Sequence, residues 1–241
     1  MLAMLAVGSL LLASLPGGGD AADAADWIVP AAVDGADQGP SPRIVGGVEV
    51  DPPGRYPFIA ALVEHRGDAY WDQYCAGSVI SADWVLTAAH CVAGETASTV
   101  DVVMGRHDLS SNTGERIRAT EIIVHPGWDE DTSTNDMALI RLAEPTSFPA
   151  VALPADGSLE APGTSLTAIG WGDTHSVPQW PYQLREVQLP VVDDAACRAA
   201  YRGYIDAPTA VDLCAGDLDA GGIDTCQGDS GGPLFASTAA G

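Results

Sequence analysis

The sequence predicts an all-β protein. Short runs rich in Val, Ile and Thr are separated by clusters of Gly, Pro, Asp and Asn, a pattern typical of strands joined by turns. Four such runs lie at 77–80, 100–104, 121–124 and 165–169, whereas the one helical pattern, at 193–201, is short. The length of 241 residues allows one large β domain or two small ones.

The first residues predict export. Residues 1–15 form an apolar run that is followed by Pro16 and three glycines. A membrane-spanning helix needs about 20 apolar residues, so this shorter run predicts a signal peptide at about 1–24 and no stable membrane insertion. A retained N-terminal anchor is the alternative. Residues 25–43 are then an acidic, alanine-rich propeptide, and the mature protein is expected to be secreted.

The sequence at 224–233, Asp-Thr-Cys-Gln-Gly-Asp-Ser-Gly-Gly-Pro, contains a candidate nucleophile. Ser230 lies in a glycine-rich turn, and glycine permits backbone conformations that approach a substrate closely. A serine hydroxyl needs a base to take its proton and N–H donors to stabilise the oxyanion that forms. By itself this pattern also fits an ordinary tight loop, so the interpretation depends on partners elsewhere in the chain.

Two upstream segments supply those partners. Residues 85–91 read Val-Leu-Thr-Ala-Ala-His-Cys, which predicts a buried strand ending in a turn that presents His90. Histidine is the usual proton shuttle near pH 7. Asp136 comes just before an apolar strand, where a buried carboxylate needs a partner. The chain order His, Asp, Ser differs from the orders found in subtilisins and in α/β-hydrolases.

Five motifs in order, IVGG, LTAAHC, NDMALIRL, GWG and GDSGGP, make the chain resemble the chymotrypsin and trypsin family of serine endopeptidases. The resemblance begins at Ile44 and runs to the end of the chain. It implies a peptidase domain at 44–241 made of two antiparallel six-stranded β-barrels, the first at about 44–155 and the second at about 156–241. It also implies a hydrolase that needs no cofactor.

The same resemblance implies the catalytic roles. Ser230 is expected to be the nucleophile, His90 the general base and then the general acid, and Asp136 the carboxylate that orients the imidazole. The backbone N–H groups of Gly228 and Ser230 would form the oxyanion hole.

Activation and specificity follow in the same way. Cleavage between Arg43 and Ile44 would convert a zymogen by freeing an amine that pairs with Asp229, whether the chain cleaves itself or another protease does so. Asp224 matches the acid at the base of the specificity pocket in trypsin-like members. It predicts cleavage after Arg or Lys, because a buried carboxylate binds a long cationic side chain more favourably than an apolar one. The expected partners are proteins or peptides containing Arg or Lys, and protein protease inhibitors.

The five cysteines fit an oxidising compartment. The family pattern implies two disulfides, Cys75 with Cys91 and Cys197 with Cys214, and leaves Cys226 without an assigned partner. Metal binding is the alternative, but no CxxC or HxxxH spacing supports it. Calcium-binding relatives carry an acid in the loop that corresponds to 105–115, where Arg106 stands here. No metal is expected.

The charge balance is strongly acidic. Ten basic residues, all of them Arg, face 33 acidic residues, for a net charge of −23. Such a surface repels a phosphate backbone, so nucleic-acid binding is excluded. The charge could attract basic substrates, but solubility and overall composition account for it at least as well.

The chain ends eleven residues after Ser230, at Gly241, whereas the family continues through further strands and a terminal helix. We therefore expect an incomplete second barrel, with exposed strand edges that favour aggregation over catalysis. An inactive fragment or a noncatalytic protease-like binding protein is the alternative function. The three catalytic residue types and the activation sequence speak against it, and a fluorophosphonate that labels Ser230 would discriminate.

Overall fold

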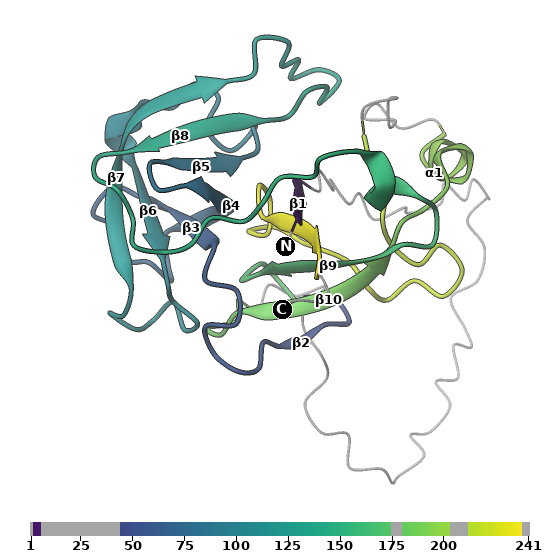
Figure 1. The fold of residues 1–241 in the computed structure, drawn as a ribbon, viewed down its shortest axis with the longest axis horizontal. Coiled ribbons are helices and arrows are strands. Elements are labelled where there is room, and N and C mark those ends of the chain that lie inside the picture. The colour runs from purple at the N-terminus through teal and green to yellow at the C-terminus, as the bar shows by residue number, and fades with distance from the viewer. Residues whose placement is uncertain (1, 6–43, 175–179, 203–211, 238–241) are drawn as a thin grey trace, which may run out of the picture.

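The computed structural model describes residues 2–5, 44–174, 180–202 and 212–237. Strands are the main regular secondary structure of these residues, and they form two separate β units that lie side by side (Figure 1). All four runs expected to be strands lie in strands, and the short helical pattern is a helix. The predicted all-β class is therefore confirmed.

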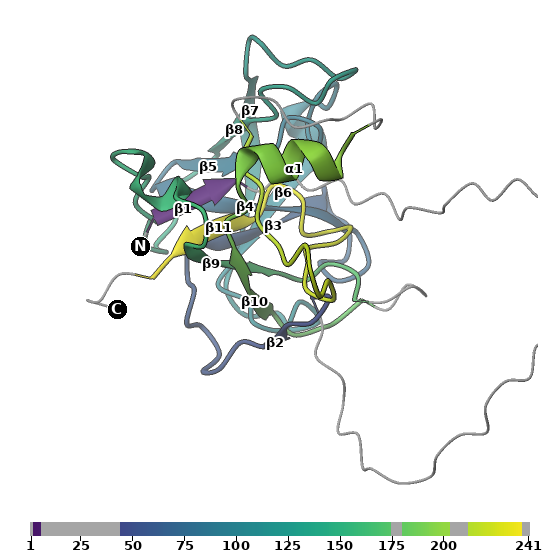
Figure 2. The same cartoon turned by 90° about the vertical axis from the view of Figure 1, so that its right-hand side faces the viewer.

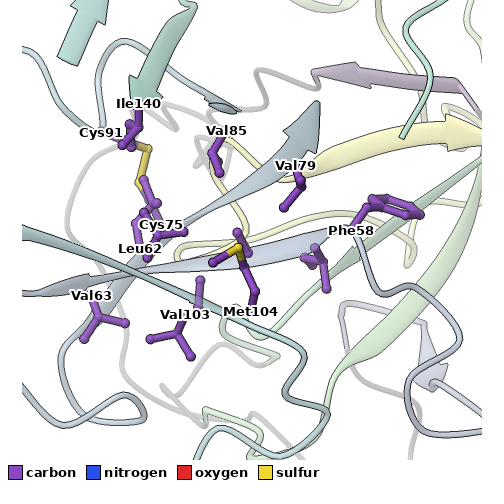
Figure 3. Close-up of a cluster of buried hydrophobic side chains, with 14 of the residues drawn as sticks. Phe58, Leu62, Val63, Cys75, Val79, Val85, Cys91, Val103, Met104 and Ile140 are labelled. Atoms are coloured by element: carbon purple, nitrogen blue, oxygen red, sulfur yellow. A yellow bond between two sulfur atoms is a disulfide. The ribbon is translucent and has the colours of Figure 1, made fainter. Parts of the chain in front are cut away.

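The first unit is a closed barrel of six antiparallel strands in the order β3-β4-β5-β8-β7-β6. Closure leaves no unpaired edge in this unit. Its interior is filled by apolar side chains next to the Cys75–Cys91 disulfide (Figure 3). The strands are β3 (Ile59–Glu64), β4 (Gln73–Ser81), β5 (Trp84–Thr87), β6 (Val100–Met104), β7 (Glu115–Val124) and β8 (Ala138–Leu142).

The second unit is an open five-stranded sheet in the order β1-β11-β9-β10-β2, which fits the expectation of an incomplete second barrel. Its last strand, β11, pairs on one side with β9 and on the other with β1, close to the N-terminus (Figure 2). The strands are β1 (Leu2–Leu5), β2 (Val48–Glu49), β9 (Ser165–Gly170), β10 (Arg185–Pro190) and β11 (Pro233–Ala236).

Two segments reach the second sheet from outside its expected range of 156–241. Residues of β2 pair with β10, although they precede the first barrel in sequence, so the start of the domain crosses to the second unit. The backbone of β1 belongs to the expected signal peptide. The rest of that segment and of the expected propeptide, including Arg43, lies outside the described residues.

Helices are few and short. Helix α1 (Asp194–Ala200) begins at Asp193, whose carboxylate accepts hydrogen bonds from the backbone N–H groups of Ala195 and Ala196. Two 3₁₀ turns, η1 (Ala97–Thr99) and η2 (Gly157–Glu160), are the other helical segments among the residues that the structure describes. In the described part of the chain, no helix has the length and apolar character needed to cross a bilayer.

An aromatic cluster joins the two units. The rings of Tyr56 and Phe58 each meet Phe235 of β11 edge to face, with centroids 5.1 and 5.2 Å apart. Phe58 and Phe235 are almost completely buried, so this contact continues the core of the barrel into the second unit. The segment that follows Phe58 is β3, and the segment that precedes Phe235 is the candidate nucleophile loop. The cluster thus fixes that loop against the barrel.

Candidate active site

The pairing of β5 with β8 brings His90 and Asp136 together. Thr87 at the end of β5 lies opposite Ala138 at the start of β8, so the residues just beyond each end face one another. The Asp136 carboxylate accepts a hydrogen bond from His90 Nδ1 at 2.6 Å and a second from the His90 backbone N at 2.7 Å. The carboxylate therefore fixes both the ring and the main chain of the histidine.

The two side chains differ in exposure in a way that suits proton transfer. The Asp136 side chain is 1% exposed, whereas that of His90 is 40% exposed. An ionised carboxylate can only accept a hydrogen bond, so the proton of the neutral imidazole lies on Nδ1. This leaves Nε2 as the acceptor, on an accessible ring that can take a proton from a nucleophile.

Ser230 lies beside this pair in the loop that precedes β11. Its carbonyl oxygen accepts a hydrogen bond from Ala76 N of β4 at 2.8 Å and is 3.7 Å from the Cys91 sulfur, which is 3.6 Å from His90 Nε2. No hydrogen bond joins Ser230 to His90 among the described residues. Catalytic hydrogen bonds of this kind often tighten only when substrate is bound. The Cys91 sulfur thus lies close to both His90 and Ser230.

The two candidate oxyanion donors are unengaged in the described part of the chain, where neither Gly228 N nor Ser230 N donates a hydrogen bond. Gly228 is buried and has a φ of +92°, a conformation that favours glycine. A side chain would not fit either, because a Cβ at this position would lie 2.6 Å from the ring of Trp180. These constraints explain why a glycine is needed at 228.

Ile44 is completely buried and packs in the apolar cluster of the second unit. The backbone after it docks on the segment that precedes the nucleophile loop, since Val45 O accepts a hydrogen bond from Asp224 N at 3.0 Å. A Cβ on Gly46 would lie 2.2 Å from the carbonyl oxygen of Gly222, which shows how tightly the two segments meet. Ile44, the first residue after the expected cleavage point, is therefore buried in the second unit.

Asp229 is buried next to the candidate nucleophile, Ser230. Its carboxylate accepts hydrogen bonds from Gly172 N at 2.8 Å and from Cys226 N at 3.0 Å. Among the described residues no cationic side chain forms an ion pair with it. Burial raises the pKa of this carboxyl to about 7, although the two N–H groups lower it. A cation that reached Asp229 would relieve this cost.

Asp224 lies half-buried at the end of the segment that contacts Val45. One carboxylate oxygen accepts a hydrogen bond from Thr225 N at 2.7 Å. Burial raises the pKa of Asp224, and its negative charge contributes, after burial, to the raised pKa of Tyr201. Within the described residues no Arg or His forms an ion pair with Asp224, so its carboxylate has no counter-charge there.

The structure contains both disulfides that the resemblance implied, Cys75–Cys91 and Cys197–Cys214, and leaves Cys226 free. Cys75 and Cys91 also lie close enough to His90 to resemble a metal-binding group. Their sulfurs are bonded to each other and have no thiolate to offer a metal. In the loop at 105–115, the Arg106 guanidinium donates to the carbonyl oxygens of Leu109 and Thr113.

Sequence reasoning missed two residues at this site. Gln73, in β4 of the first unit, is buried and donates a hydrogen bond to the carbonyl oxygen of Gly228, and the ring of Trp180 packs on Gly228. A glutamine at the start of an otherwise apolar strand was a weak signal for the first. Nothing in the local sequence around Trp180 pointed to Gly228.

A buried carboxylate that orients an imidazole, next to a serine in a glycine loop with free N–H groups, is the arrangement of a serine hydrolase. The sequence model of the Trypsin family matches residues 44–241. The chain therefore belongs to the trypsin family and is a serine endopeptidase.

Individual relatives agree. The chain is 38% identical over 195 residues to a protein named Trypsin from Saccharopolyspora erythraea, covering 80% of this chain and 82% of that protein. It is 39% identical over 171 residues to Serine protease 1 of Canis lupus familiaris, covering 68% of this chain and 65% of that protein. Trypsin of Sus scrofa is 38% identical over 171 residues, with 68% and 70% covered.

Proposed function

We propose that the protein is a secreted endopeptidase that is made as an inactive precursor, is activated by cleavage between Arg43 and Ile44, and hydrolyses peptide bonds after Arg or Lys. The double hydrogen bond from His90 to Asp136 is the observation that carries the catalytic part of this proposal. The alternative, a noncatalytic binding protein, has no use for that arrangement.

In the proposed reaction, Ser230 Oγ attacks the carbonyl carbon of the scissile bond while its proton passes to His90 Nε2. The oxyanion accepts hydrogen bonds from the N–H groups of Gly228 and Ser230, which are unengaged within the described residues. His90 then gives the proton to the departing amine as the C–N bond breaks. Water attacks the acyl-enzyme by the same route and releases the acid. Asp136 keeps the imidazole in the required tautomer throughout.

The environment of Asp224 supports the specificity for basic residues. Its half-buried carboxylate has no ion pair in the described part of the chain and is destabilised by burial. A guanidinium or ammonium that reached it would recover that electrostatic cost, whereas an apolar side chain would leave the charge unpaired. This predicts a large preference for Arg and Lys over Phe.

The surroundings of Ile44 and Asp229 support activation by cleavage. Ile44 is buried in the second unit, and Asp229 is a buried carboxylate without an ion pair among the described residues. A new α-amino group on Ile44 would supply the cation that this carboxylate lacks. Pairing would hold Asp229, and with it the neighbouring Ser230 N–H, in a fixed orientation.

Covalent labelling tests the proposal directly. The protein is treated with a fluorophosphonate before and after cleavage at Arg43, with Ser230→Ala as the control. We expect strong labelling of Ser230 only after cleavage, and hydrolysis of matched Arg and Lys peptides well ahead of the Phe peptide. Labelling that is absent after complete cleavage would refute the catalytic proposal. A preference for Phe would refute the specificity.

A further inference from the structure

The candidate nucleophile loop, which contains residues 228–230, is attached to β4 of the first barrel by two hydrogen bonds. Gln73 Nε2 donates to Gly228 O at 2.7 Å, and Ala76 N donates to Ser230 O at 2.8 Å. The two acceptors flank Asp229 in sequence. Strand β4 thus holds the loop on both sides of Asp229. The same barrel, through the end of β5, carries His90.

The Gln73 side chain has a single possible orientation for this role. It is 8% exposed, and its Nε2 also donates to Cys75 O at 3.0 Å. Both partners are carbonyl oxygens, so only the NH₂ end of the amide can serve them, and its two hydrogens match the two acceptors. The amide therefore links the nucleophile loop to the backbone of Cys75, whose disulfide partner is the neighbour of His90.

An irregularity in β4 directs Gln73 toward the loop. Leu62 lies opposite Cys75, but the next residue of β3, Val63, lies opposite Gln73, so Tyr74 is an extra residue on β4. Such a bulge breaks the alternation of side chains along a strand and redirects them, and bulges are frequent next to active sites. Without the bulge, the alternation would direct this side chain differently.

The hydrogen bonds around Gly228 control where its N–H group points. Asp173 N donates to Gln227 O at 2.8 Å, and in a trans peptide the N–H of Gly228 is directed away from that carbonyl. The carbonyl of Gly228 itself is held by Gln73. Both peptide planes on either side of Gly228 are thus anchored. Glycine has no Cβ to restrict rotation, so the anchors must supply the rigidity.

We propose that Gln73 is a positioning residue for the oxyanion hole: its amide fixes the Gly228–Asp229 peptide and, together with the Asp173–Gln227 hydrogen bond, restrains both backbone dihedrals of Gly228, whose N–H would face the developing oxyanion. This inference rests on the proposed function, because it assumes that Gly228 and Ser230 stabilise an oxyanion. Loss of the amide leaves the N–H donor in place but frees the Gly228–Asp229 peptide, so that only the Asp173–Gln227 hydrogen bond still restrains Gly228. The transition state loses stabilisation, whereas substrate binding at Asp224 is retained.

The variant Gln73→Met tests the proposal, since methionine has a similar length but no donor. After cleavage at Arg43, kcat per titrated active site on an Arg peptide amide is expected to fall about 10- to 100-fold. This loss should not exceed the fall of about 100- to 1,000-fold that follows complete removal of one oxyanion donor. KM is expected to change less than about twofold. Affinity for an Arg peptide aldehyde should fall in parallel with kcat, and affinity for benzamidine should not. The matched control is Gln188→Met, at an exposed glutamine of β10.

The outcomes separate the possible roles. An unchanged kcat per site, or a loss that weakens benzamidine as much as the aldehyde, would overturn the positioning role. If the wild-type protein neither turns over substrate nor takes a fluorophosphonate label, the proposed function itself fails, and this inference fails with it.

A second variant covers the case in which Gln73→Met does not fold. Gln73→Glu keeps the shape of the side chain but can donate a hydrogen bond only when protonated. Its kcat relative to that of wild type should therefore rise as the pH is lowered from about 8 to about 6, because burial raises the pKa of a carboxyl group. A ratio that does not change with pH would contradict the proposal.

Discussion

The carboxylate of Asp136 holds His90 at two points, with one oxygen 2.6 Å from the ring Nδ1 and the other 2.7 Å from the backbone nitrogen. The imidazole can therefore neither rotate about its side-chain bonds nor exchange its tautomer without breaking a hydrogen bond to a buried charge. This contact couples the end of β5 to the start of β8.

Replacing that carboxylate by an amide should abolish most of the activity. In Asp136→Asn, the amide nitrogen can donate to Nδ1 and stabilise the wrong tautomer, which places the proton on Nε2. We expect kcat to fall by about 10⁴ with little change in KM. Steady-state kinetics on an Arg peptide amide measures this, with Asp83→Asn as a control at an exposed aspartate. A loss smaller than tenfold would show that Asp136 does not orient the base.

Preventing cleavage should leave the precursor inactive. The variant Arg43→Gln removes the basic residue before Ile44, so no amine is freed to pair with the buried Asp229. We expect neither turnover nor fluorophosphonate labelling after treatment with an Arg-specific protease. Arg118→Gln, at an exposed arginine of β7, controls for the loss of one positive charge and should activate normally. Full activity of uncleaved Arg43→Gln would disprove activation by cleavage.

The stability of the uncleaved precursor should depend on the ionisation of Asp229. Burial raises its pKa from 3.8 to about 7 in the folded protein, so the folded state binds the proton more tightly than the unfolded state. The sign follows from linkage: the stabilisation is complete below pH of about 4 and is lost as the pH rises through about 7. At 1.36 kcal/mol per pKa unit, the change approaches about 4 kcal/mol.

Urea unfolding at pH 4 to 8 measures this effect in the Ser230→Ala background, which prevents self-cleavage. Asp229→Asn cannot ionise and serves as the reference, so the difference in unfolding free energy between the two proteins should grow as the pH rises. After cleavage at Arg43, the amine of Ile44 should reverse the difference and make Asp229 the more stabilising residue. A difference that does not vary with pH would contradict the prediction.

Removing the carboxylate of Asp224 should change the specificity. In Asp224→Ser, a basic side chain would be buried without a counter-charge, so kcat/KM for an Arg peptide should fall by about 10⁴. The value for a Phe peptide should stay the same or increase. Asp219→Ser, at an exposed aspartate of the same segment, is the matched control. If Arg and Phe peptides lose activity equally, Asp224 supports the fold of the segment and does not select the substrate.

The sequence was informative where chemistry is encoded locally. The residues around Ser230, His90 and Asp136 form short motifs, and each motif alone specifies a glycine turn, a strand end or a buried acid. Strand positions such as Val100–Met104 followed from β-branched residues between turn residues. The family resemblance added the two disulfides, both of which the structure contains. These features can be predicted without knowing which strands pair with one another.

The remaining features depend on contacts between distant segments. Gln73 and Gly228 are 155 residues apart in sequence. Their hydrogen bond depends on the extra residue Tyr74 in β4, which no local sequence pattern predicts. The crossing of β2 to the second sheet and the packing of Trp180 on Gly228 are similar cases. The sequence by itself determined the fold class and the reaction type, and it predicted the residues that carry the reaction. Only the tertiary structure decided how the candidate nucleophile loop is held. The physical reason is that strand register and the contacts between the two β units arise from packing over the whole chain.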